Sequence, residues 1–150
     1  MQIALGWVMI LFGGALYLAQ LVSSVNFSFA QRLGIQERAE ASDPLLQRSE
    51  KYTAYWDLIS LIWLPAAGIL MVMSHHMWPI VSLVGGAIYL DTAGREAVKN
   101  LSFRHEGLNM GTVSQQRVFL ASYIVMAAIA VVVIVYSIFE LYSLGPDQIR

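Results

Sequence analysis

Three long stretches of this 150-residue chain contain no acidic or basic residue other than histidine. They cover residues 1–31, 58–90 and 118–139. A helix that crosses a bilayer needs about 20 mostly apolar residues, so each stretch is long enough to span a membrane. Only 13% of the residues are charged and 57% are hydrophobic, whereas about a quarter are charged in soluble domains. The sequence therefore predicts an integral membrane protein.

The middle stretch is too long for one span and is interrupted by the polar segment 74–79, which reads SHHMWP. This pattern is typical of a tight hairpin with its tryptophan at the level of the lipid headgroups. We therefore predict an all-α fold, a four-helix transmembrane bundle that forms one membrane domain over residues 1–150. The spans are expected at residues 3–23, 52–73, 79–93 and 118–142, with connecting loops at 24–51 and 94–117.

Lysine and arginine residues are concentrated in two of the connecting segments. Four lie between the first two spans and four between the last two, whereas the opposite side holds only Arg150. Because basic loops remain in the cytoplasm, we expect both long loops inside and both termini, with the histidine hairpin, outside. This asymmetry in a compact chain predicts a bacterial inner-membrane protein.

Two ten-residue segments in the first and third spans are close copies. Residues 11–20 read LFGGALYLAQ and residues 83–92 read LVGGAIYLDT, with six identical positions. A tandem duplication of a two-helix hairpin would produce this pattern, and chance similarity in an apolar composition is the alternative. The small residues of these spans, such as Gly13, Gly14, Gly86 and Gly94, predict close packing of helices.

Local signals predict how the helices begin and bend. The segment 42–44, Ser-Asp-Pro, combines a capping side chain with proline at the first helical position. Thr112 and Gln115 have the spacing of a capping box. Pro65 has no N–H to donate to the Leu61 carbonyl, so we expect a kink there.

Ionisable residues within membrane spans are functional candidates, because charge is costly there. Asp57 and Asp91 are expected near the cytoplasmic interface, and Arg95 can pair with Asp91 at a spacing of four residues. Glu96 and Lys99 extend this cluster. One hypothesis is a cytoplasm-facing pocket in which Asp57, Asp91 and Arg95 are catalytic. In it, Arg48 and Arg104 would bind an anionic group. The alternative, which we favour, is anchoring at the interface.

A second candidate lies on the outer side, where thioether and imidazole groups suit copper, with zinc as a second option. Its candidate ligands are Met71, Met73, His75, His76, Met77 and Glu140. The alternative is that the methionines fill gaps between helices. We otherwise expect no cofactor: the chain has no cysteine, and haem is disfavoured because His105 is expected on the opposite side from the histidine pair.

The length, the four spans, the outside termini and the two basic cytoplasmic loops resemble the MAPEG family of membrane glutathione transferases and eicosanoid enzymes. The resemblance covers the whole chain in size and topology. It implies a trimer with a cytoplasm-facing site for a thiol tripeptide, near Arg48, Lys51, Arg95 and Arg104. The chain departs from the family at its Asn-x-x-Glu signature, where residues 54–57 read AYWD, and in helix three, where only Tyr89 and Arg95 remain of the pattern.

Several other function classes have no support in the sequence. A formal net charge of −1 provides no basic surface for nucleic acid, and the nucleotide-binding and serine-hydrolase motifs are missing. We therefore predict a small polytopic protein that is a structural or interaction subunit of an inner-membrane assembly. Its expected partners are membrane lipid and other membrane subunits, or a second copy of itself. The alternatives are a MAPEG-like enzyme for an anionic amphipathic substrate and an outer-face copper- or zinc-binding protein.

Overall fold

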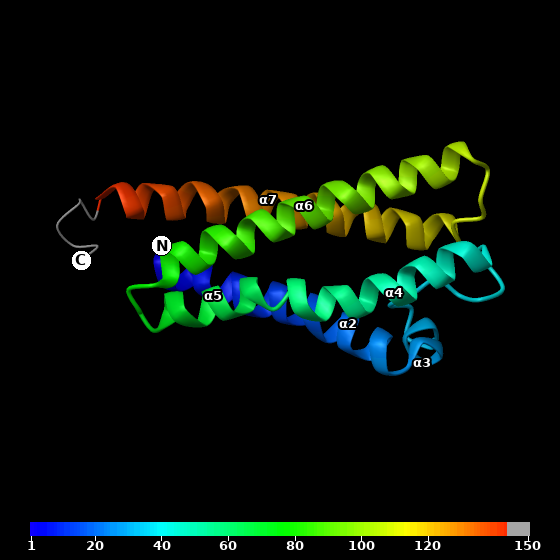
Figure 1. Cartoon of the computed structure of the whole chain (residues 1–150), viewed down its shortest axis with the longest axis horizontal. Coiled ribbons are helices and arrows are strands. Elements are labelled where there is room, and N and C mark those ends of the chain that lie inside the picture. The colour runs from blue at the N-terminus through cyan, green and yellow to red at the C-terminus, as the bar shows by residue number, and fades with distance from the viewer. Residues whose placement is uncertain (144–150) are drawn as a thin grey trace.

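The computed structural model describes residues 1–143 as an all-α protein made of long helices that lie side by side (Figure 1). The segments α1, η1 and α2 follow one another as one continuous rod, in which η1 is a π-helical turn. In chain order the elements are α1 (Gln2–Val8), η1 (Met9–Gly13), α2 (Gly14–Val25), α3 (Phe27–Arg32), α4 (Pro44–Ser60), α5 (Trp63–Val72), α6 (Trp78–His105) and α7 (Val113–Ser143).

Three segments are long and apolar enough to cross a membrane, namely Gln2–Val25, Pro44–Val72 and Val113–Ser143. The chain is therefore an integral membrane protein with three candidate membrane-spanning helices. The predicted span at 79–93 does not reach the same standard, because α6 continues from a short apolar part into a charged part without a break. The predicted loops 24–51 and 94–117 are also too long, because helical residues occupy much of them. These residues belong to α3 and to the ends of α4, α6 and α7.

The two ends of the bundle differ in what they contain. The start of α1, the turn before α6 and the last described residues of α7 lie together at one end (Figure 1). The connections 33–43 and 106–112 lie at the other, which we call the loop end. There the backbone N–H of Asp43 donates to the Asn109 carbonyl at 2.9 Å, and Ser42 pairs with Met110 in an isolated β-bridge. The two loops are therefore joined to each other.

The predicted helix starts are confirmed. The Asp43 side chain accepts a hydrogen bond from the Leu45 N–H at 2.8 Å, with Pro44 as the first helical residue. The Thr112 hydroxyl accepts from the Gln115 N–H at 3.3 Å and also contacts the Gln115 side chain. These caps satisfy N–H groups that have no partner inside the helix.

The helix is interrupted where the sequence predicts a kink. The rod formed by α4 and α5 is interrupted between Ser60 and Trp63, and Pro65 lies just beyond the break. Pro65 has no N–H to donate to the Leu61 carbonyl, which accepts instead a hydrogen bond from the Tyr89 hydroxyl of α6 at 2.9 Å. A side chain from another helix therefore stabilises the break.

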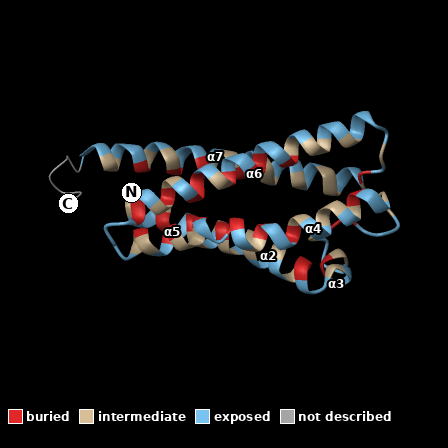
Figure 2. Cartoon of the chain, viewed as in Figure 1, coloured by how far each residue is buried: buried red, intermediate tan, exposed pale blue. Residues whose placement is uncertain are grey.

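The core lies along the facing sides of the rods (Figure 2). Glycines allow close approach at several points: a Cβ on Gly68 would lie 2.7 Å from the Gly6 carbonyl oxygen, and one on Gly86 would lie 2.8 Å from Ile134. The prediction of glycine packing holds for Gly86 and for Gly13, which abuts Pro65. It fails for Gly14 and Gly94, which have no neighbour within 4 Å in the part of the chain that is described.

The copied segments lie in η1 and α2 (residues 11–20) and in α6 (residues 83–92), and they do not have equivalent surroundings. Gly13 packs on Pro65 and Gly14 is open, whereas Gly85 packs on Leu64 and Gly86 on α7. Within residues 1–143 we find no structural sign of a duplication.

Candidate functional site: a polar cavity at the loop end

Acidic side chains are buried between the helices toward the loop end. Glu50 and Asp57 lie two turns apart on α4, and this spacing places them on one face of the helix. Glu96 of α6 and Glu37 of the connection before α4 complete the group. The exposed fractions are 2% for Asp57, 6% for Glu37 and 7% for Glu96. Such burial is rare for carboxylates unless they have partners.

One lysine pairs with two of these four carboxylates. Lys99 Nζ lies 2.7 Å from Glu50 Oε1, and it also pairs with Glu96 one turn earlier on α6. The three side chains are mostly buried, so solvent screens their interaction only weakly. In the described part of the chain, Glu37 and Asp57 have no ion-pair partner within 4 Å.

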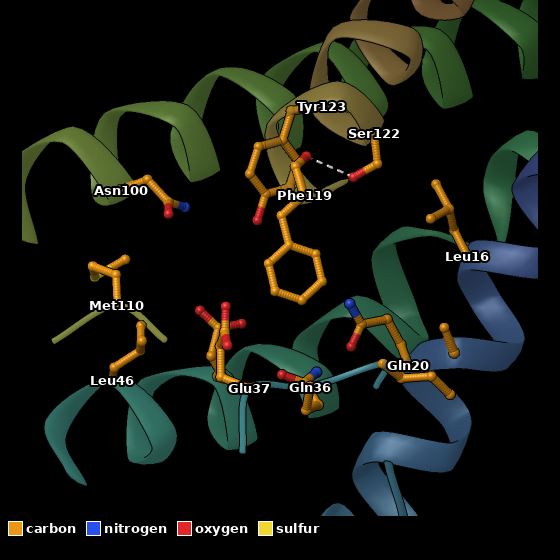
Figure 3. A pocket seen from close by; sticks show the side chains of 13 residues that line it. Leu16, Gln20, Gln36, Glu37, Leu46, Asn100, Met110, Phe119, Ser122 and Tyr123 are labelled. Carbon is orange, nitrogen blue, oxygen red and sulfur yellow. Dashed lines mark hydrogen bonds between the residues drawn. The ribbon is translucent and has the colours of Figure 1, made fainter. Parts of the chain in front are cut away.

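A cavity of about 140 Å³ opens among these groups and adjoins a second of about 70 Å³. We call the two together the polar cavity; both are lined by Leu16, Gln20, Glu50, Ser122 and Tyr123. Glu37 and Phe119 line the larger part (Figure 3), and Asp57 and Glu96 line the smaller. The cavity therefore combines carboxylates with apolar and aromatic walls.

Glu37 is the acidic group without a hydrogen-bond donor. Its Oε2 atom is buried and has no hydrogen-bond partner among residues 1–143. Burial raises the pKa of Glu37 to about 7, and the negative charge of Glu50 contributes to the shift. Gly111, at φ +84°, lies against the Glu37 carboxylate, and a Cβ there would overlap the carboxylate oxygens. The two joined loops thus hold an acid that titrates near neutral pH.

The structure does not form the predicted catalytic pocket of Asp57, Asp91 and Arg95. Asp57 is buried in the polar cavity and accepts from the Ser60 hydroxyl at 3.4 Å. Asp91 and Arg95 are exposed and line a groove on the outside of the bundle instead. Each residue of a helix is rotated by about 100° from the last, so positions adjacent to the buried Thr92 and Glu96 turn away from the cavity.

The expected pairing of Asp91 with Arg95 is also wrong, since no ion pair joins them in the described chain. The two candidate anion-binding arginines are exposed and line different pockets. Arg48 lies in a shallow groove with Lys51 and Tyr52 on α4. Arg104 lines a different pocket, where it donates to Gln116 Oε1 at 2.7 Å.

The candidate metal ligands at the opposite end differ in burial and come from several segments of the chain. The rings of His75 and His76 stack with centroids 4.4 Å apart, and His75 Nδ1 accepts from the Met77 N–H at 3.3 Å. Met71 is buried in the core, whereas Met73 is 69% exposed. Glu140 lies on α7. Over residues 1–143 there is no group of three histidine, aspartate or glutamate residues that could hold a metal ion. A copper or zinc site built with thioethers stays a prediction.

Sequence reasoning did not single out Glu37 or Glu50, because both fall in a segment predicted to be a loop. The seven-residue spacing of Glu50 and Asp57 is a signal that could have placed Glu50 on the buried face. Nothing comparable exists for Glu37, whose position depends on the contact between the two loops.

Comparison of the sequence with protein families, curated proteins and solved structures finds no match. The resemblance to the MAPEG family therefore rests on size and predicted topology alone. Fold and site together define an all-α integral membrane protein with an acidic cavity inside its bundle.

Proposed function

We propose that this chain is a small polytopic subunit of an inner-membrane assembly, and that a transmembrane helix of another subunit binds along its outer groove. The groove lies between α4, α5 and α6 and has a volume of about 480 Å³. Its walls include Trp56, Trp63, Ala87, Asp91 and Arg95. The observation that carries the proposal is the exposure of Asp91 and Arg95 on the outside of a membrane bundle.

The depth of Asp91 makes this exposure costly. It lies 13 residues after Trp78, which begins α6. At a rise of 1.5 Å per residue this is about 20 Å, within the roughly 30 Å of hydrocarbon if Trp78 marks the outer interface. A charged side chain costs about 2.5–3.5 kcal/mol at the centre of a span on insertion scales, and this is an upper value for Asp91, which lies about two thirds of the way across. A hydrogen-bond donor or basic group on a neighbouring helix would offset that cost.

The proposal includes a topology in which α6 crosses the membrane as a fourth helix. The α6 segment from Trp78 to Tyr89 is uncharged and lies beside two apolar rods. The loop end, with its arginines and lysines, would face the cytoplasm, and both termini would face the periplasm of a bacterial cell. This topology is supported by the position of the two connections at one end of the bundle and of the start of α1 and the end of α7 at the other (Figure 1).

The MAPEG-like enzyme has less support from the geometry. An anionic substrate needs converging basic groups, whereas Arg48 and Arg104 line separate grooves. Four carboxylates line the polar cavity, and the lysine beside them is already paired with two of these, so the site disfavours anions.

The chain has no cysteine, so a single introduced cysteine can carry a photo-crosslinker to one chosen face. Ala87→Cys would place a benzophenone reagent in the groove, and Val132→Cys on α7 is the control at another exposed apolar position. In native membranes we expect a discrete adduct with a different protein from position 87 only. The adduct should be lost when Asp91→Leu is added. Equal labelling at both positions, or adducts with lipid alone, would contradict the proposal.

A further inference from the structure

We propose that the polar cavity binds a small organic cation, an ammonium group attached to a short apolar body. This inference is independent of the proposed partner helix, because the polar cavity is inside the bundle and the groove is outside it. It rests on three observations: the surplus of carboxylates, a buried acceptor without a donor, and the aromatic walls.

The surplus of negative charge favours a cationic ligand. Lys99 is held by Glu50 and Glu96 and cannot reach further acids without breaking those pairs. Glu37 and Asp57 therefore face the cavity without a basic neighbour within 4 Å in residues 1–143. Buried carboxylates are stable only when they are protonated or are paired with a cation.

The unpartnered polar atoms of the residues that line the larger cavity are hydrogen-bond acceptors. Glu37 Oε2 and Gln20 Oε1 are both buried, and neither receives a hydrogen bond from any residue that the structure describes. The Ser122 hydroxyl donates to the Phe119 carbonyl at 2.7 Å (Figure 3), so its proton is already engaged. A ligand that satisfies this site must donate hydrogen bonds, as an ammonium group does.

The walls determine which kind of cation fits. Leu16, Leu46, Met110 and Phe119 line the larger part. With Tyr123 also in its wall, the cavity has two aromatic rings, the groups that form cation–π contacts. A metal ion is disfavoured, because no three acidic or histidine residues converge anywhere in residues 1–143. The volume of about 140 Å³ is close to the roughly 150 Å³ of a cavity that binds benzene, so a ligand of about six non-hydrogen atoms fits.

The test uses the full chain in detergent and n-butylammonium chloride as the probe. Isothermal titration calorimetry at pH 8 should show saturable binding of one cation per chain. The isosteric neutral alcohol n-butanol and sodium chloride at equal ionic strength should not bind. Glu37→Gln should weaken binding about tenfold or more, because a charge-assisted hydrogen bond is lost. Glu40→Gln removes an exposed acid three residues away and should leave binding unchanged.

Asp57→Asn provides a second variant should Glu37→Gln fail to fold, and it should also weaken binding. Binding should weaken as the pH falls from 8 to 5.5, because protonation of Glu37 removes its charge. The proposal is overturned if n-butylammonium shows no saturable binding or if n-butanol binds equally well. It is also overturned if folded Glu37→Gln protein binds like the wild type. If Glu37 binds protons but no organic cation, n-butylammonium will show no saturable binding.

Discussion

At the scale of single residues, the position of Glu37 depends on a glycine in a distant loop. Gly111 has φ +84°, a conformation that L side chains rarely adopt, and its Cα lies against the Glu37 carboxylate. Position 111 therefore requires glycine for two reasons: the backbone conformation disfavours other residues, and a side chain would overlap the Glu37 carboxylate. The two loops must meet correctly for the acid to line the polar cavity.

Gly111→Ala should destabilise the loop end, because the new methyl group overlaps the Glu37 carboxylate and the backbone is strained. We expect a loss of about 1–3 kcal/mol in unfolding free energy, together with weaker binding of n-butylammonium. Unfolding by denaturant in detergent micelles measures the first effect. Gly107→Ala is the control for backbone strain alone. Gly107 also has a positive φ, but a Cβ there would meet no atom within 4 Å among the described residues. Equal losses in both variants would show that the overlap has no effect.

The raised pKa of Glu37 predicts a pH dependence of stability. Its pKa is about 7 in the folded protein against 4.5 without the burial and the charge of Glu50. The folded state therefore binds more protons between these values, and the contribution of Glu37 to stability falls as pH rises from about 4.5 to about 7. Glu37→Gln should remove this part of the slope, and Glu40→Gln should retain it. Unfolding curves recorded at pH 5 and pH 8 would disagree with this account if Glu37→Gln left the difference unchanged.

Lys99 is the cation shared by Glu50 and Glu96, so its loss leaves two buried carboxylates without a partner. Lys99→Met should cost about 3–5 kcal/mol of stability. Adding Glu50→Gln and Glu96→Gln to that variant should recover much of the loss, since the uncompensated charge is then gone. A triple variant no more stable than Lys99→Met, as judged by thermal unfolding, would contradict this role.

At the scale of elements, the break between α4 and α5 is held by a side chain of α6. The Tyr89 hydroxyl donates to the Leu61 carbonyl at 2.9 Å and lies 3.4 Å from the Gly13 carbonyl of η1. One buried hydroxyl thus links three rods at the point where the helical hydrogen bonding is interrupted. The sequence alone predicted the break, from Pro65, but did not identify the donor on another helix.

Tyr89→Phe should cost about 1–3 kcal/mol, because a buried carbonyl loses its donor. Pro65→Ala restores a backbone N–H four residues after Leu61, and in the Tyr89→Phe background it should be less harmful than alone. A double-mutant cycle by denaturant unfolding measures this coupling. Strictly additive effects would show that the hydroxyl and the proline do not act on the same carbonyl.

Glycine packing in the membrane can be tested by a matched pair of substitutions. Gly68→Ala would place a methyl group 2.7 Å from the Gly6 carbonyl oxygen, so α1 and α5 must separate. Gly14→Ala on α2 meets nothing within 4 Å in residues 1–143 and should be neutral or mildly stabilising. Only the first variant should show a lowered melting temperature in detergent.

At the scale of the whole molecule, hydropathy and helix signals predicted most of the fold, because long uncharged runs and caps are local features. They predicted the all-α class, the starts of α4 and α7, and an irregularity of the helix at Pro65, where the structure has a break. The sequence did not predict which charged side chains face the inside of the bundle and which face outward. Asp91 and Thr92 are neighbours in sequence, yet only Thr92 is buried. The buried position of Glu37 depends on a contact between two loops, and such a contact leaves no periodic pattern in the sequence.

The outer groove is the feature that connects this single chain to an assembly. Asp91 and Arg95 leave the outside of the bundle charged. In the proposed topology, in which α6 crosses the membrane, lipid solvates this charge poorly. The central claim is therefore that another membrane subunit covers this face.

The most direct test is the mass and composition of the complex extracted gently from its own membrane and measured by native mass spectrometry. We predict co-migration with different, larger subunits, and release of the chain from them in the Asp91→Leu variant. A monomer, or an oligomer of this chain alone, would contradict the account. A trimer of identical chains would in addition favour the comparison with membrane glutathione transferases.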